Sequence, residues 1–426
     1  MPELELKIPR NGMVRISGPA EIVIREGSLV VLGAELAEGD RLSISEYRSY
    51  ALKALEDTRI LVGLGGQGRI EWVGSDTEPL EEWVSIAEAV IDSCTLPCRV
   101  AIIGPVDSGK TSFTALLANR ALARGVPVAV IDSDVGQADI GPPGFISLSI
   151  PSDWILWLRE LEPGLMRFIG SIEPAPVVGR IVSQTSILVE RAEREGVGLS
   201  VVDTDGWVEG WNALEYKGDL VRAADIDRIV VLGDPGLYEF FQKLRPGGVY
   251  YARSPVVRVS RDASDRRNLR SMNYRRFLEG GFTREIDLRG VSVFGSCLFS
   301  SQPFGGDGIK SRLESTLGKT VEYIGRYPGG YCLVVDTGEE SLGAISKAVQ
   351  RELSGDVIIL DKFGFKGVLV GLSDGTGDYP AVVEDVDLDR RVIRVKTRYR
   401  GDVEAVFFGR IRLEGYREVP KRRIWI

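Results

Sequence analysis

A glycine-rich loop between a strand and a helix constrains the fold of this chain most strongly. Residues 104–112 read GPVDSGKTS, which fits the pattern of a glycine, four residues and then Gly-Lys-Thr. The apolar run RVAIIG precedes the loop, and the helical run TSFTALLANRALARG follows it. This context predicts a loop that binds the phosphates of a nucleoside triphosphate; a glycine turn with a stray lysine is the disfavoured alternative.

The residue types of the loop each suit a phosphate contact. Gly104 and Gly109 let the backbone curl so that its N–H groups point at phosphate oxygens. Lys110 would reach the β- and γ-phosphates, and Thr111 would offer its hydroxyl to Mg²⁺. We therefore predict a nucleotide site composed of Gly104, Pro105, Val106, Asp107, Ser108, Gly109, Lys110, Thr111 and Ser112.

The rest of the chain divides into three regions, which fits its 426 residues. Residues 1–79 read as a small β domain, whose run RILVGLGGQGRIEWVG predicts a hairpin, and residues 80–98 as a connecting helix. Apolar strands alternate with helices over 99–289, which predicts an α/β domain with a parallel sheet and helices on both faces. Its predicted strands are RVAIIG, VPVAVIDSD, LSVVDTDG, DRIVVLGD and PVVRVS. Residues 290–426 read as a second β-rich domain.

The amino-acid composition limits which side chains can act as an acid, a base or a metal ligand. The chain has four cysteines and no histidine, so acid–base chemistry must use carboxylates, lysine or tyrosine. Isolated buried thiols are favoured over a zinc site that would gather all four cysteines. The net charge of −8 runs against the trend for a nucleic-acid binder. Scarce asparagine and glutamine beside plentiful arginine and glutamate favour a thermophilic source.

The chain carries no apolar run long enough to span a membrane and does not begin like a secretory signal. We therefore expect a cytoplasmic protein without a membrane partner.

Two aspartates at the end of the second predicted strand suit a metal ion and a general base. Asp132 and Asp134 are two residues apart, so both could face the crevice where ligands bind. An aspartate-rich turn without function is the alternative. Asp203, Thr204, Asp205 and Gly206 form the Asp-x-x-Gly pattern of GTPases, but no Asn-Lys-x-Asp reader of guanine follows, so a GTPase is disfavoured.

Arginine clusters in one segment. Between 253 and 276 the arginines are Arg253, Arg258, Arg261, Arg266, Arg267, Arg270, Arg275 and Arg276. A solvated helix face is the ordinary explanation. A guanidinium group can, however, bind two phosphate oxygens at once. The use of arginine without lysine in this segment therefore also fits a lid that covers the transferred phosphate. Trp207 and Trp211 are equally compatible with core packing and with stacking on a nucleobase.

Together these segments resemble the polynucleotide 5′-hydroxyl kinases, a family that includes the kinase subunit of the eukaryotic mRNA 3′-end cleavage factor and archaeal homologues. The resemblance spans most of the chain and is weakest in the C-terminal domain. It rests on GPVDSGKTS, DSDVGQADIGPPGFISL, DTDGWVEGW, VVRVSRDASDRRNLRSMNYRRFLEG and the N-terminal LVVLGAELAEGDRLSISEYRSYALKAL.

The resemblance implies transfer of the ATP γ-phosphate to the 5′-OH of RNA, DNA or both. Asp134 would be the general base, with Lys110 on the phosphates and Thr111 and Asp132 at Mg²⁺; the resemblance leaves open how Asp132 and Asp134 divide the two roles. Gln137, Thr204 and Trp207 would contact substrate, and Arg261, Arg266 and Arg270 would be lid arginines. A scaffold subunit that binds ATP without transferring phosphate is the alternative, and the sequence identifies no protein partner.

Overall fold

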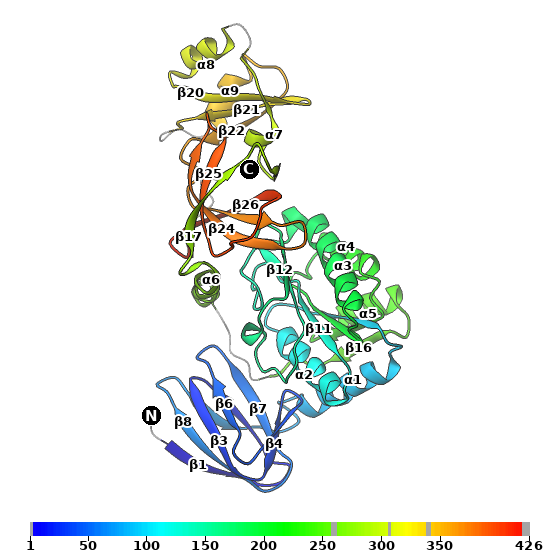
Figure 1. The fold of residues 1–426 in the computed structure, drawn as a ribbon. Coiled ribbons are helices and arrows are strands. Elements are labelled where there is room, and N and C mark those ends of the chain that lie inside the picture. Colours follow the sequence, from blue (N-terminus) through cyan, green and yellow to red (C-terminus); the bar gives the residue numbers. More distant parts are fainter. Residues whose placement is uncertain (1–2, 257–261, 306–307, 338–341, 420–426) are drawn as a thin grey trace.

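The chain folds into three bodies in series. The computed structural model describes residues 3–256, 262–305, 308–337 and 342–419. The N-terminal strands lie at one end, a sheet covered by helices lies in the middle, and the C-terminal strands and helices lie at the other end (Figure 1). Within these described ranges no helix is both long and apolar enough to cross a membrane.

The N-terminal body consists of two antiparallel sheets. One sheet has the strand order β1-β8-β3-β6 and the other β5-β4-β7-β2-β9. Their facing apolar side chains form the domain core. The strands are β1 (Glu3–Ile8), β2 (Met13–Ser17), β3 (Ala20–Glu26), β4 (Ser28–Val31), β5 (Ala34–Ala37), β6 (Arg41–Ile44), β7 (Ser49–Ala54), β8 (Thr58–Leu64) and β9 (Arg69–Trp72).

The hairpin predicted for the end of this body is wrong. β8 and β9 follow each other in the chain, but β8 pairs with β1 and β3, whereas β9 pairs with β2 in the other sheet. Because β8 already has a neighbour on each edge, no edge is left for β9. The turn between Gly65 and Gly68 therefore carries the chain from one sheet to the other.

The central body confirms the α/β prediction. Its sheet has the order β13-β12-β11-β14-β10-β15-β16, in which β10, β11, β14, β15 and β16 are parallel to one another. β12 is antiparallel to both of its neighbours, β11 and β13. Most of the strand predicted at 255–260 lies outside the described residues, and β16 is the fifth parallel strand. The strands are β10 (Cys98–Ile103), β11 (Val128–Asp132), β12 (Phe145–Ser149), β13 (Leu165–Phe168), β14 (Leu199–Asp203), β15 (Arg228–Leu232) and β16 (Val249–Ala252).

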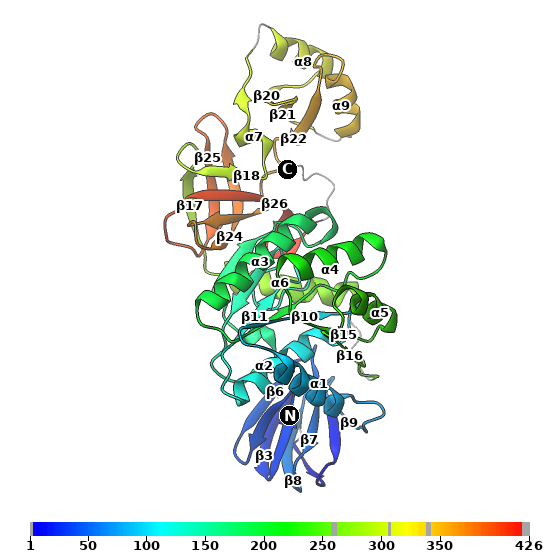
Figure 2. The same ribbon diagram turned by 90° about the vertical axis from the view of Figure 1, so that its right-hand side faces the viewer.

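Helices cover both faces of this sheet, because successive residues of a strand point to opposite sides. Val100 and Ile102 of β10 join the core shared with α1, α2 and the N-terminal sheets. Ala101 and Ile103 join the core under α3, α4 and α5, the helices in front of the sheet in Figure 2. The helices are α1 (Leu80–Ser93), α2 (Lys110–Ala123), α3 (Val178–Arg194), α4 (Trp211–Ala223), α5 (Pro235–Leu244) and α6 (Ala263–Leu278).

The C-terminal body contains a sheet of order β17-β25-β24-β23-β26-β18, with β27 paired to β26, and a smaller sheet of order β19-β20-β21-β22. Its first strand, β17, begins before residue 290, where the sequence places the domain boundary. The elements are β17 (Phe282–Asp287), β18 (Ser292–Phe294), α7 (Cys297–Ser300), β19 (Gln302–Pro303), α8 (Ile309–Leu317), β20 (Val321–Tyr327), β21 (Gly330–Val335), α9 (Leu342–Val349), β22 (Asp356–Asp361), β23 (Val368–Ser373), β24 (Asp378–Asp387), β25 (Val392–Thr397), β26 (Ala405–Glu414) and β27 (Arg417–Glu418).

The prediction of isolated thiols is also wrong. Cys94 is disulfide-bonded to Cys98, and Cys297 to Cys332, with Cα–Cα separations of 5.7 and 6.0 Å. The turn between α1 and β10 brings the first pair together, and the packing of α7 on β21 brings the second pair together. The second pairing depends on tertiary packing, which a cysteine count cannot reveal.

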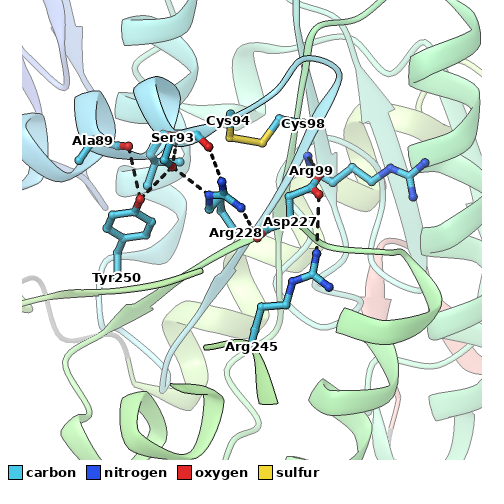
Figure 3. The surroundings of a disulfide bond; sticks show 10 residues. Ala89, Ser93, Cys94, Cys98, Arg99, Asp227, Arg228, Arg245 and Tyr250 are labelled. Carbon is cyan, nitrogen blue, oxygen red and sulfur yellow. Dashed lines mark hydrogen bonds and ion pairs between the residues drawn. A yellow bond between two sulfur atoms is a disulfide. The ribbon is translucent and has the colours of Figure 1, made fainter. Parts of the chain in front are cut away.

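Hydrogen bonds around the first disulfide fix the end of α1 (Figure 3). The Ser93 Oγ accepts from Nε of Arg228 at 2.9 Å and from the hydroxyl of Tyr250 at 2.8 Å. These two partners lie on β15 and β16. The junction between α1 and β10 is thus tied to the sheet edge, which sets the direction in which β10 enters the phosphate loop.

Candidate active site

A cavity of about 180 Å³ lies between the N-terminal sheets and the phosphate loop. The N-terminal body and α1 form one wall, while the loop and the ends of the central strands form the other. Among the lining residues are Arg15, Tyr47, Arg48, Ser49, Tyr50, Glu78 and Trp83 on the first wall and residues 106–112, Asp134, Gln137, Gly206 and Arg266 on the second. Most of the predicted nucleotide site therefore lines one cavity.

The phosphate loop has the backbone that its glycines predict. Gly109, which precedes α2, has φ of 101°, in the left-handed region that favours glycine. A Cβ there would lie 2.8 Å from the Trp83 ring, so glycine is also required by close packing. Nζ of Lys110 donates to the carbonyl of Pro105 at 2.8 Å. Burial lowers the pKa of Lys110, and nearby Asp203 and Asp134 oppose that shift.

Asp132, at the end of β11, uses its carboxylate oxygens for hydrogen bonds within its own loop. Its Oδ2 accepts the backbone N–H groups of Asp139 and Ile140 at 2.6 and 3.0 Å, and its Oδ1 accepts that of Asp134 at 3.2 Å. Burial raises the pKa of this carboxyl well above its ordinary value. Asp132 is absent from the cavity lining. The structure thus gives Asp132 a loop-holding role, in contrast to the predicted metal contact.

Asp134 faces the cavity together with Gln137. Its Oδ1 accepts the backbone N–H groups of Gly136 and Gln137 at 2.9 and 2.8 Å, which fixes the orientation of the carboxylate. Burial raises the pKa of Asp134, and Asp205 adds to the effect while Lys110 opposes it. A half-buried carboxylate that lines a cavity and has a raised pKa is suited to accept a proton.

Asp203 is a candidate site residue that the sequence interpretation did not assign, although, like Asp132, it is absent from the cavity lining. It ends β14, beside the strand that leads to the loop, and the side chain of Thr111 lies near enough to lower the pKa of its carboxyl. Its Oδ1 is buried and has no hydrogen-bond partner in the described part of the chain. Burial raises the pKa of Asp203 to about 7, against the influence of Lys110 and Thr111. The sequence signal for this residue is the Asp-x-x-Gly pattern after β14, which begins with Asp203.

The oxygen atoms of Thr111 and Asp203 fit a hard divalent cation such as Mg²⁺. The unpartnered Oδ1 of Asp203 is the observation that supports this fit. No cluster of three or more potential protein ligands occurs among the residues described by the structure. Magnesium sites of this kind are completed by substrate phosphates and water rather than by further protein ligands.

The loop after β14 turns most of its side chains away from the cavity. Asp205 forms an ion pair with Lys217 at 2.9 Å and accepts the Tyr216 hydroxyl at 2.6 Å. Thr204 is buried and donates to the carbonyl of Ile102 at 2.8 Å. The negative charge of Asp205 is therefore compensated inside the protein rather than presented to phosphates. Thr204 likewise does not reach the cavity in this structure.

Only glycine from this loop lines the cavity. A Cβ on Gly206 would lie 2.6 Å from Cγ2 of Val106, so the loop contacts the phosphate loop directly. Trp207 is half-buried, and its ring stacks on Tyr216 with 5.9 Å between centroids. Trp211, at the start of α4, is 65% exposed. Trp207 is thus packed against the protein, whereas Trp211 is exposed to solvent.

The three predicted lid arginines have different surroundings. Arg266 lines the cavity and forms an ion pair with Asp107 of the phosphate loop at 2.9 Å. Arg270, one turn later on α6, pairs instead with Glu418 of β27 at 2.7 Å. Arg261 lies outside the described residues. Only Arg266 is therefore positioned at the cavity by this structure.

The N-terminal wall contains charges that no local sequence pattern indicates. Arg15 and Glu78 form a buried ion pair, with Nε 3.0 Å from Oε2. Burial raises the pKa of Glu78, against the effect of Arg15. Arg48 pairs with Asp139 at 3.0 Å. Because Asp139 also donates its N–H to the Asp132 carboxylate, the N-terminal wall is connected to the loop that carries Asp134.

Known proteins resemble this chain over most of its length. The family model described as mRNA cleavage and polyadenylation factor CLP1 P-loop matches residues 104–280. The polyribonucleotide 5′-hydroxyl-kinase of Thermococcus kodakarensis is 30% identical over 340 residues, covering 78% of this chain and 93% of the relative. That of Pyrococcus horikoshii is 31% identical over 340 residues, covering 75% and 91%. The predicted thermophilic source fits these archaeal relatives.

A solved structure has the same fold. The structure of the wild-type Clp1p–Pcf11p (454–563) complex aligns with a TM-score of 0.64 and 16% identity, covering 96% of this chain and 98% of that one. At this identity the likeness concerns the fold alone. The family match, the archaeal relatives and the phosphate-loop site agree with the predicted resemblance, and the chain belongs to the polyribonucleotide 5′-hydroxyl-kinase family.

Proposed function

We propose that this protein transfers the γ-phosphate of ATP to the 5′-hydroxyl of RNA. One observation carries the proposal: Lys110 and Asp134 line the same cavity from two different loops. Pure nucleotide binding needs the phosphate loop but not a carboxylate that faces the same cavity as its lysine. The arrangement therefore favours an active kinase over an ATP-binding scaffold.

The reaction follows from the positions of these side chains. Asp134 accepts the proton of the 5′-hydroxyl, the hydroxyl oxygen forms a bond to the γ-phosphorus, and the bond from that phosphorus to the β–γ bridging oxygen breaks to release ADP. Lys110 exchanges its contact with Pro105 for the phosphates. Arg266 adds positive charge as negative charge spreads over the transferred group.

Magnesium would be held by Thr111 and Asp203. When bound, it neutralises phosphate charge and orients the phosphate chain. Thr111 and Asp203 are the oxygen donors that we assign to it, in place of the Asp132 contact predicted from sequence.

The nucleotide base would enter the N-terminal side of the cavity. Trp83 and Leu80 supply an apolar wall, and the Arg15–Glu78 pair supplies polar groups. A site with these features suits a flat heteroaromatic ring, and we assign it to adenine.

RNA is the acceptor in the names of the archaeal relatives, and we propose it as the main acceptor here. DNA is the further candidate, to be distinguished by assay because the 2′-OH is what separates the two. Inside a cell the enzyme would meet ATP and RNA ends in the cytoplasm. A protein partner is suggested only by the Pcf11p that accompanies the structural neighbour.

The test uses γ-labelled ATP, Mg²⁺ and matched RNA and DNA oligonucleotides that carry a 5′-OH. We expect RNA to gain label, and Lys110→Ala to abolish the gain. Oligonucleotides already phosphorylated at the 5′ end provide the control and should gain none. ATP binding by the wild-type protein without labelling of any acceptor would refute the kinase proposal and favour the scaffold.

A further inference from the structure

We propose that Glu418 of β27 is a positioning residue for phosphoryl transfer: it holds the lid helix α6 so that Arg266 stands at the phosphate loop. In this proposal Arg270 is the anchor of the lid rather than a phosphate ligand. The inference rests on the proposed function for its kinetic consequences. Its structural part can be tested independently.

The anchor is a two-point ion pair. Nε of Arg270 lies 2.7 Å from Oε1 of Glu418, and the second nitrogen, Nη2, lies 2.8 Å from Oε2. Both side chains are largely buried, at 15% and 13% exposure. The hydroxyl of Tyr274 adds a third contact to Oε1, at 3.2 Å. A guanidinium fork on a carboxylate is geometrically specific, so this contact fixes the rotation of α6 as well as its distance.

The helix connects this anchor to the phosphate loop. Residues four apart lie on neighbouring turns of the same helix face. Arg266 is one turn before Arg270, and its guanidinium lies 2.9 Å from Oδ2 of Asp107. Any shift of the helix at Arg270 therefore moves Arg266 relative to the site. A displacement of about 1 Å at a catalytic group can lower a rate about a hundredfold.

The same helix also contacts the loop of the general base. The side-chain amide of Asn273 donates to the carbonyls of Ala138 and Gly141 at 2.8 and 2.6 Å. That loop begins with Asp132 and Asp134. Helix α6 thus joins three elements: the phosphate loop, the loop of the general base and the C-terminal strand. Glu418 is the contribution of the C-terminal body to this junction.

The decisive experiment exchanges the two charges. Glu418→Gln and Arg270→Glu should each lower kcat by at least about tenfold, while the KM for ATP stays within about twofold. The double variant R270E/E418R should recover most of the lost kcat, because it restores the pair with reversed polarity. Asn268→Ala is the control on the same helix: Asn268 lies on α6 and is exposed, so its kcat should equal that of the wild type.

Hydrogen exchange of the full-length protein supplies a readout that needs no activity. Amides of 263–278 should exchange faster in Glu418→Gln than in the wild type, and the double variant should restore protection. Restored protection with kcat still as low as that of Arg270→Glu would overturn the proposal, since Arg270 would then act on phosphate directly. Unchanged kcat and unchanged exchange in Glu418→Gln would overturn it equally.

If the proposed kinase activity is absent, the experiments give a result that differs from failure of the anchor. A wild-type protein that labels no acceptor would refute the kinase activity. The hydrogen-exchange comparison would then decide the anchor alone: faster exchange in Glu418→Gln supports it, and unchanged exchange refutes it.

Discussion

The loops after β11 and β14 carry the same Asp-x-Asp pattern at adjacent strand ends, yet they use it in opposite order. After β11 the first aspartate, Asp132, binds backbone N–H groups, and the second, Asp134, faces the cavity. After β14 the first aspartate, Asp203, contacts Thr111, and the second, Asp205, is paired with Lys217.

The difference teaches that the spacing of two carboxylates does not assign their roles. What differs is how the two oxygens of each carboxylate are used. Both oxygens of Asp132 accept backbone N–H groups, and Asp205 pairs with the buried Lys217. Both N–H bonds to Asp134 go to its Oδ1, and Oδ1 of Asp203 has no partner among the described residues. We therefore expect Asp134 and Asp203 to be the aspartates that meet a ligand. This division of roles can be tested with isosteric asparagine variants of the individual aspartates.

The largest effect should come from Asp134→Asn. The variant keeps the size of the side chain but cannot take the proton of the acceptor, so kcat should fall by about 10²- to 10⁴-fold. The affinity for ATP, measured by calorimetry, should change little. Asp219→Asn on the exposed side of α4 is the matched control and should leave both values unchanged. A wild-type kcat in Asp134→Asn would remove Asp134 from the chemistry.

Asp203→Asn should alter the requirement for Mg²⁺. Loss of a charged oxygen donor should raise the Mg²⁺ concentration for half-maximal rate by about 10- to 100-fold. Because the pKa of Asp203 is about 7, protons compete with the cation below that pH. In the wild type the Mg²⁺ requirement should therefore fall as the pH rises through 7, and this dependence should weaken in the variant.

The same carboxyl should affect the stability of the protein without ligands. Its pKa is raised from 3.8 in the unfolded chain to about 7 in the folded one. Between these values the folded state keeps a proton that the unfolded state has lost, so the free energy of unfolding should decrease as the pH rises from 4 to 7. Denaturant melts of Asp203→Asn should show a smaller decrease; an identical decrease would mean that other groups cause it.

Asp132→Asn should have the smallest effect on the reaction. One oxygen that accepts two N–H groups is lost or rotated away, so the free energy of unfolding should fall by about 1–3 kcal/mol. At a temperature where the variant is folded, its Mg²⁺ requirement should match that of the wild type. A Mg²⁺ requirement raised as strongly as in Asp203→Asn would return the metal contact to Asp132.

The sequence predicts the features that are local in the chain. The phosphate loop between β10 and α2 and the alternation of strands and helices follow from short patterns, and both were confirmed in the central fold. The cavity wall formed by Arg15 and Glu78 could not be predicted, since these residues are 63 positions apart and show no pattern. The anchor between Arg270 and Glu418 spans 148 positions.

The errors have a common cause. An arginine-rich helix indicates positive charge but not which carboxylates pair with it, so the sequence gives no sign that Arg270 contacts Glu418. The glycine-rich turn after β8 indicates a reversal but not the sheet in which the next strand continues. Cys297 and Cys332 meet through the packing of α7 on β21. In each case the partner lies in another element, and only tertiary packing selects it.

The position of the Trp83 ring affects where the chain can be truncated. It belongs to α1, fills the space beside Gly109 and donates from Nε1 to the carbonyl of Arg253 at 2.8 Å. The helix between the first two bodies is therefore the back wall of the nucleotide cavity as well as a linker. A fragment that started at β10 would lose this wall. We therefore expect a fragment that begins at β10 to bind ATP less tightly than the full chain.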